Sequence, residues 1–166
     1  MNLNSLFSKA GVSGNMTQDI TLLAVIIVAS LLFGLFIGRF KLVTVLINIY
    51  IAFALLATVP EKYLANYNYQ LIFFYAVLVI LTLAGRKLFE IYISSSGSGF
   101  MWRVFAMSFL EVVFLLSITL AILPKKIALG YVSPNAYQYL ASADWRFVWM
   151  VVPLIFIFII HKRLNR

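Results

Sequence analysis

The stretch from Ser30 to Lys41, SLLFGLFIGRFK, decides the fold of this 166-residue chain. It places small residues at Ser30, Gly34 and Gly38, each four positions apart, and it ends in two cations. Small residues at this spacing lie on one face of a helix and let membrane helices approach closely. Because a second apolar run follows at once, the cations Arg39 and Lys41 predict a tight cytoplasmic hairpin between two membrane-spanning helices.

The composition indicates that lipid is the solvent for much of the chain. Hydrophobic residues make up 64% of it and charged residues only 11%, whereas a soluble domain is roughly 45–50% apolar and 25% charged. A chain of this length cannot hide so much apolar surface in its own interior. We therefore predict an all-α integral membrane protein with a single transmembrane domain over residues 20–166.

Five apolar runs are candidates for membrane-spanning helices. They are separated by the basic turn, by Pro60, by the Gly/Ser turn SSSGSG at Ser94–Gly99 and by Pro124. The first run has nineteen residues, which reach roughly 28 Å at a helical rise of about 1.5 Å per residue, close to the hydrocarbon thickness. The predicted spans are residues 20–38, 42–59, 70–87, 104–123 and 145–160.

The segments beside these runs carry local signals. Residues 1–19 precede the first span, and their apolar spacing favours a short interfacial helix, with a frayed terminus as the alternative. Ser133 followed by Pro134 is typical of a helix N-cap with proline in the first position, so the loop 127–145 is expected to contain a short helix. Pro153 in the middle of the last span predicts a kink.

The basic residues predict the orientation. With the hairpin turn inside, eight cations lie on the cytoplasmic side: Arg39, Lys41, Arg86, Lys87, Arg103, Lys162, Arg163 and Arg166. Five cations lie outside: Lys9, Lys62, Lys125, Lys126 and Arg146. Because Lys and Arg accumulate in cytoplasmic loops, we expect the amino terminus outside and the carboxyl terminus in the cytoplasm. The first five of the inner set are also expected to contact lipid headgroups.

The residue inventory argues against several classes of protein. The chain has no Cys and a single His, His161, so neither a disulfide nor a dedicated transition-metal site is expected. The net charge of +8 comes from cations at the ends of apolar runs, which favours anionic lipid over nucleic acid as the partner. The sequence also lacks a Ser–His–Asp set, an HExxH motif and a phosphate-binding loop. We predict a protein that is not an enzyme and needs no cofactor or metal.

Glu111 is the only carboxylate inside an apolar run. It lies eight residues from Arg103, about 12 Å along a helix, and an ionised group at that depth must be paired, protonated or hydrated. Asn48 lies seven residues from Lys41 and therefore at a similar depth from the same face. Glu111 and Asn48 form the candidate intramembrane polar site. Its role is either an ion or proton site, or a contact completed by a partner, or a structural hydrogen bond between helices.

The face formed by Ser30, Gly34 and Gly38 has two interpretations. It is either a dimer or partner contact, or a contact with the span at 42–59 or at 104–123 of the same chain. The second interpretation is favoured because the chain has several helices of its own.

Three segments in order carry a family resemblance. They are the glycine-flanked basic turn GLFIGRFK, the run LVTVLINIYIAFALLA that follows it, and the later segment SGSGFMWRVFAMSFLEVVFLL. Over about residues 20–123 this order resembles the colicin V production protein family of bacterial inner-membrane proteins. The resemblance implies four spans, a link to bacteriocin export and envelope integrity, and no defined catalytic residues. This chain departs from that pattern by a fifth span and a 19-residue aromatic loop before it.

We therefore predict a small inner-membrane accessory or assembly protein. It is expected to act with membrane lipids and with other membrane proteins or further copies of itself. One alternative is a small transporter or channel subunit that uses Glu111. Another is a structural subunit of a larger membrane complex.

Overall fold

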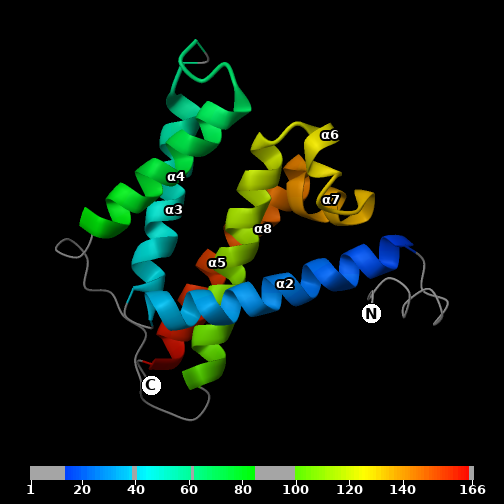
Figure 1. The fold of residues 1–166 in the computed structure, drawn as a ribbon. Coiled ribbons are helices and arrows are strands. Elements are labelled where there is room, and N and C mark those ends of the chain that lie inside the picture. Colours follow the sequence, from blue (N-terminus) through cyan, green and yellow to red (C-terminus); the bar gives the residue numbers. More distant parts are fainter. Residues whose placement is uncertain (1–13, 39–40, 61, 85–99, 165–166) are drawn as a thin grey trace.

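Every element that the structure describes is a helix, which confirms the all-α prediction for those residues. The computed structural model describes residues 14–38, 41–60, 62–84 and 100–164 (Figure 1). The helices are α2 (Gly14–Ile37), α3 (Leu42–Thr58), α4 (Tyr67–Ala84), α5 (Phe100–Ile122), α6 (Lys125–Ala128), α7 (Pro134–Ala141) and α8 (Ala143–Leu164).

Three of these helices are long and apolar enough to cross a membrane, namely the segments Met16–Ile37, Tyr67–Ala84 and Met101–Ile122. A fourth span results if α7 and the following part of α8, which meet at a bend of 56°, are counted as one. The chain is thus an all-α protein with three to four candidate membrane spans. The predicted count of five also requires α3, whose 17 residues reach roughly 26 Å, and it stays a prediction.

The helices extend beyond the apolar runs that predicted them. α2 begins at Gly14, six residues before the first predicted span, so residues 14–19 continue that helix. In the same way, α4 begins at Tyr67 and α5 at Phe100, three and four residues before the predicted spans. An apolar run marks only the part of a helix that suits hydrocarbon, whereas backbone hydrogen bonds continue into the polar residues that flank it.

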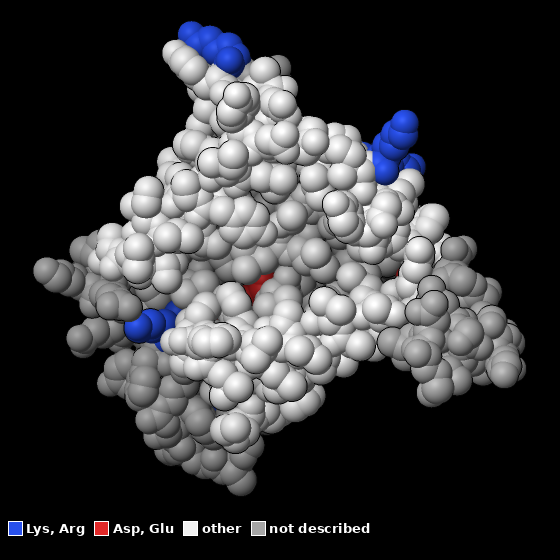
Figure 2. Space-filling model, in the orientation of Figure 1, with Lys and Arg blue, Asp and Glu red and all other residues white. Residues whose placement is uncertain are grey.

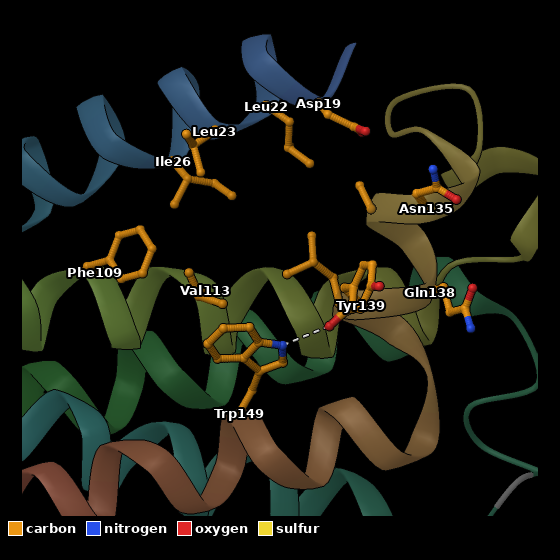
Figure 3. A pocket seen from close by; sticks show the side chains of 12 residues that line it. Asp19, Leu22, Leu23, Ile26, Phe109, Val113, Asn135, Gln138, Tyr139 and Trp149 are labelled. Carbon is orange, nitrogen blue, oxygen red and sulfur yellow. Dashed lines mark hydrogen bonds between the residues drawn. The ribbon is translucent and has the colours of Figure 1, made fainter. Parts of the chain in front are cut away.

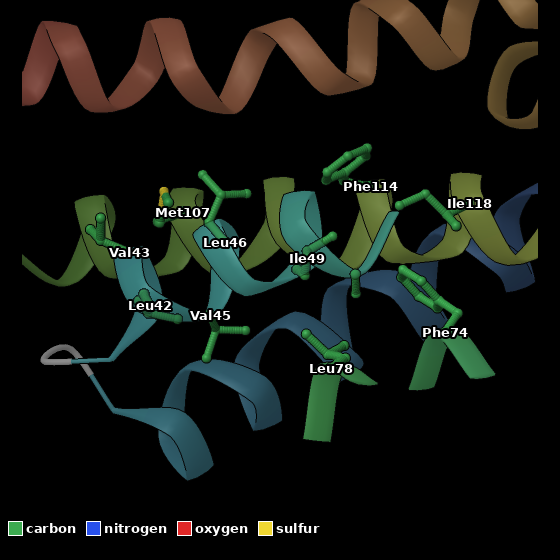
Figure 4. Packing of buried hydrophobic residues seen from close by; sticks show 11 residues of the cluster. Leu42, Val43, Val45, Leu46, Ile49, Phe74, Leu78, Met107, Phe114 and Ile118 are labelled. Atoms are coloured by element: carbon green, nitrogen blue, oxygen red, sulfur yellow. The ribbon is translucent and has the colours of Figure 1, made fainter. Parts of the chain in front are cut away.

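Helix α5 lies at the centre of the fold. It contacts α2, α3, α4, α7 and α8, while α3 also packs on α4 and α7 on α8 (Figure 1). The core between α3, α4 and α5 includes Leu46, Ile49, Phe74 and Phe114, all fully buried. Figure 4 shows these side chains gathered where the three helices meet. Any polar residue on the inner face of α5 is therefore surrounded by the chain's own helices.

A short connection joins α2 to α3. Gly38 has a φ of +70°, a left-handed backbone conformation that glycine adopts without steric cost. Its N–H donates to the carbonyl of Gly34 at 3.0 Å, and its own carbonyl accepts from the N–H of Lys41 at 3.1 Å. Beyond this turn the two helices diverge: α2 crosses α5, and α3 runs beside α4 (Figure 1). The predicted antiparallel hairpin within a membrane stays a prediction.

The short helix predicted after Ser133 is confirmed as α7. The Ser133 hydroxyl accepts a hydrogen bond from the N–H of Ala136 at 3.0 Å, and Pro134 takes the first helical position. Leu140 is buried at the end of this helix, and its carbonyl accepts a hydrogen bond from the Ser117 hydroxyl of α5 at 2.5 Å. α7 therefore packs against α5 and α8.

Candidate intramembrane carboxyl site and adjoining groove

Glu111 lies near the middle of α5 and is fully buried, with an exposed fraction of 0%. Residues three or four positions away share its face of the helix, and three of them, Met107, Ser108 and Phe114, are equally buried. α2, α3 and α8 all pack on α5. The carboxyl group is therefore enclosed by helices of this chain and does not face lipid.

Neither carboxyl oxygen of Glu111 makes a hydrogen bond with any residue in the part of the chain that the structure describes. An ionised carboxylate in such surroundings is opposed by a large desolvation free energy, and such groups become neutral instead. Most buried polar groups in proteins have a hydrogen-bond partner, so this carboxyl is an exception that calls for a reason. The enclosed state shown here therefore suits a carboxyl group that has bound a proton.

Tyr50 of α3 connects three helices beside this carboxyl group. Its ring packs on Phe114 of α5 with the centroids 5.0 Å apart. Its hydroxyl donates a hydrogen bond to the carbonyl of Met150 in α8. Tyr50 thus contacts α8 and the face of α5 that Phe114 shares with Glu111.

Asn48 is also buried, with 2% of its surface exposed, but it points elsewhere. Its Nδ2 donates to the Thr82 hydroxyl of α4 at 3.3 Å, so it forms an interhelical hydrogen bond between α3 and α4. Successive residues of a helix are about 100° apart around its axis, which directs Asn48 and Tyr50 to different neighbours. Within the described residues, Glu111 and Asn48 share no hydrogen bond.

The three small residues of the opening stretch have separate roles. Ser30 is fully buried and donates to the carbonyl of Ile26 in its own helix at 2.6 Å. Gly34 faces α5 so closely that an added Cβ would lie 2.7 Å from the Ser108 Oγ. At Gly38 an added Cβ would meet no atom within 4 Å, so this glycine serves the turn. The close contact of α2 is therefore with α5 of the same chain.

Pro153 is buried in α8, and the helix continues through it. Proline has no N–H, so the carbonyl of Trp149 loses its usual helical donor. The next carbonyl along the helix, that of Met150, accepts the Tyr50 hydroxyl. The proline and the Tyr50 hydroxyl thus act on neighbouring carbonyls in one turn of α8.

The predicted headgroup cations are described only in part. Arg39, Arg86 and Lys87 lie outside the described residues, whereas Lys41 is exposed just before α3 and Arg103 is half-buried in the first turn of α5. On the face seen in Figure 2, Lys and Arg side chains lie toward the margins, and acidic atoms show only as small patches.

A groove of about 520 Å³ opens between α2, α5, α7 and α8 (Figure 3). Asp19 of α2 and Asn135 and Gln138 of α7 line one end of it, and Phe109 of α5 lies toward the other. The sequence reasoning missed this groove because it placed Asp19 before the first span. The helical spacing of Asp19, Leu22 and Ile26, which share one face of α2, was the signal that pointed to it.

Comparison of the chain with known protein families, characterised proteins and solved structures finds no match. In the described part of the chain, no three His, Asp or Glu side chains gather into a group that could hold a metal ion. The described residues define a class: an all-α protein with apolar helices suited to a membrane and an enclosed carboxyl group that has no hydrogen-bond partner among those residues. The resemblance to colicin V production proteins stays a prediction.

Proposed function

We propose that this chain is a small, non-enzymatic transporter or channel subunit of a membrane, and that Glu111 binds and releases protons in it. The observation that carries this proposal is the complete burial of Glu111 without a hydrogen-bond partner among the described residues. Ionisable residues inside a membrane are costly and mark ion or proton pathways in many proteins. A carboxyl group kept only for structure would be expected to have a partner, as Asn48 has in Thr82.

The enclosure of Glu111 supports this role over a contact completed by a partner protein. α5 is covered by α2, α3 and α8 around the carboxyl group. A Lys or Arg from another chain would have to displace one of these helices to reach it. A proton needs no such displacement, because a chain of a few water molecules or hydroxyl groups is enough to carry it.

Tyr50 is the group that we assign to proton exchange with Glu111. Its hydroxyl lies between α3, α5 and α8 and is held by the carbonyl of Met150, one residue beyond the carbonyl that Pro153 leaves without a donor. A membrane helix with proline bends more easily at such a turn. Movement of α8 at this turn would release the Tyr50 hydroxyl and open a route from Glu111 to water.

The membrane arrangement that fits this role has five spans, with the hairpin between α2 and α3. The apolar composition of α3 and the bent pair α7–α8 support five spans. The larger number of cations on the turn side supports an outer amino terminus and a cytoplasmic carboxyl terminus. A location in a bacterial inner membrane is what the resemblance to colicin V production proteins implies. Glu111 would then lie in the inner half of the bilayer.

The second candidate is the accessory or assembly role that the sequence predicts. It is favoured by α2, which exposes large apolar side chains outside the groove, including Val28, Leu31 and Phe36. In a membrane these side chains are covered by lipid or by the apolar helix of a partner. Stable co-purification of other membrane proteins in a mild detergent would support this role.

Proton flux into liposomes tests the proposed function. The purified full chain is reconstituted with a pH-sensitive dye inside, and a potassium diffusion potential drives protons inward. We expect flux above that of empty liposomes for the native chain, and its loss in Glu111→Gln. Asp144→Asn is the matched control, because Asp144 is exposed at the start of α8 and should leave the flux unchanged. A Glu111→Gln variant with native flux, or a native chain no better than empty liposomes, contradicts the proposal.

A further inference from the structure

The groove between α2, α5, α7 and α8 is a formed site that proton transfer at Glu111 does not use. Its volume of about 520 Å³ lies within the range of roughly 300–1,000 Å³ typical of small-molecule sites. Ile26 and Val113 are buried in its wall, and Trp149 closes the side formed by α8 (Figure 3). The apolar part of the groove therefore suits an alkyl chain.

The polar groups of the groove are gathered at one end. Asp19, Asn135 and Gln138 line the half of the groove that lies away from Phe109, with Asn135 nearer to Asp19 than Gln138 is (Figure 3). Asp19 is the only charged side chain among the described residues that line the groove, although the whole chain carries a net charge of +8. This end is thus a negative site on a strongly basic protein, and it selects a positively charged group by charge complementarity.

Hydrogen bonds hold the polar end of the groove and its α8 side in place. The Ser133 hydroxyl donates to Oδ1 of Asp19 and accepts from the N–H of Ala136 in α7. The Trp149 Nε1 donates to the carbonyl of Tyr139 at 2.8 Å. The carboxylate and the indole are therefore held in place before a ligand enters, which lowers the entropy lost on binding.

We propose that this groove binds a membrane lipid with a primary-amine headgroup, with the ammonium group at Asp19 and one acyl chain beside Trp149. The separation of polar and apolar lining matches the two parts of such a lipid. The amide group of Asn135, at the same end as Asp19, supplies a hydrogen-bond donor for the phosphate that joins the ammonium group to the acyl chains (Figure 3). A lipid whose headgroup has no ammonium group, such as phosphatidylglycerol, would bring only negative charge toward Asp19 and is disfavoured.

Fluorescence quenching of Trp149 tests this proposal on the full chain. The chain has three tryptophans, so Trp102→Phe and Trp145→Phe leave Trp149 as the only emitting indole. The protein is placed in phosphatidylcholine vesicles with increasing amounts of phosphatidylethanolamine or phosphatidylglycerol that carry identical brominated acyl chains. Since an exposed ion pair contributes modestly, we expect half-quenching at a roughly two- to fivefold lower amount of phosphatidylethanolamine.

Variants of Asp19 separate a headgroup site from ordinary lipid contact. Asp19→Asn keeps an acceptor for Ser133 but removes the charge, and it should make the two lipids equal quenchers. Asp19→Glu keeps the charge and should keep the preference, as should Asp144→Asn outside the groove. Equal quenching by both lipids in the native background, a preference for phosphatidylglycerol, or a preference that persists in Asp19→Asn would overturn the proposal.

Discussion

Two buried polar side chains have opposite surroundings in this molecule. Asn48 on α3 is paired with Thr82 of α4, whereas Glu111 on α5 has no hydrogen-bond partner among the described residues. Both are almost completely buried, with 2% and 0% of their surfaces exposed. The difference teaches that burial alone does not identify a functional group. A buried polar side chain with a hydrogen-bond partner, such as Asn48, is explained by its structural role. A buried polar side chain without a partner, such as Glu111, requires a functional explanation.

Of the substitutions that test this comparison, Glu111→Leu should change the free energy of unfolding most. A buried polar group without a partner costs about 1–3 kcal/mol, so Glu111→Leu should raise the free energy of unfolding by up to about 3 kcal/mol. The same variant should lose proton flux. Reversible unfolding in mixed micelles with increasing SDS measures the first effect. A large loss of stability in Glu111→Leu would show that the carboxyl group has a structural partner.

A bulky side chain placed between α2 and α5 should have the second-largest effect on the free energy of unfolding. Gly34 faces Ser108, which lies three residues before Glu111 on α5. Gly34→Leu should lower the free energy of unfolding by about 2 kcal/mol through overpacking. The control is Gly34→Ala, alone and with Ser108→Ala, because removing the Ser108 Oγ makes room for the new Cβ. If Gly34→Leu is as stable as the native chain, α2 does not pack on α5 in the membrane.

Removal of the Tyr50 hydroxyl should have a smaller effect on stability and a clear one on proton exchange. Tyr50→Phe deletes the hydrogen bond to Met150 but keeps the ring contact with Phe114. We expect a loss of about 1 kcal/mol in the free energy of unfolding, typical of one hydrogen bond, and slower proton flux. Tyr75→Phe is the matched control, since its hydroxyl bonds to Thr119 away from this site. If Tyr50→Phe keeps the native proton flux, Tyr50 takes no part in proton exchange with Glu111.

The Asn48–Thr82 pair should show the smallest effect. Interhelical hydrogen bonds in membrane proteins contribute about 0.6 kcal/mol on average. A double-mutant cycle with Asn48→Ala and Thr82→Val should therefore give a coupling free energy of that size, with proton flux unchanged. Loss of proton flux in Asn48→Ala would show that Asn48 and Glu111 belong to one functional site, and it would contradict the contrast between them.

The sequence predicted the helical class and the positions of most helices because apolar runs and breakers are local signals. It predicted the N-cap at Ser133 for the same reason, since the cap contacts only the next turn. It paired Glu111 with Asn48 from depth along the helices, but depth does not fix rotation about a helix axis. That rotation directs Asn48 toward α4 and Tyr50 toward α8, and it follows only from the packing of all helices together.

Local sequence patterns likewise could not predict the groove or the contact between Gly34 and Ser108. Asp19 and Ser133 lie 114 positions apart in the sequence, so no local pattern joins them. Gly34 was a visible candidate for close helix packing, yet its neighbour Ser108 depends on how α2 crosses α5. Local patterns predict which face of a helix packs, whereas the partner of that face requires the fold.

The protonation state of Glu111 in the folded protein tests the central claim most directly. Infrared spectra of the native chain and of Glu111→Gln are recorded in lipid at neutral pH, and their difference isolates the carbonyl stretch of a protonated carboxylic acid. We predict that the native chain has this band, that Glu111→Gln lacks it, and that Asp144→Asn retains it. A native spectrum in which Glu111 contributes only carboxylate bands would contradict the account.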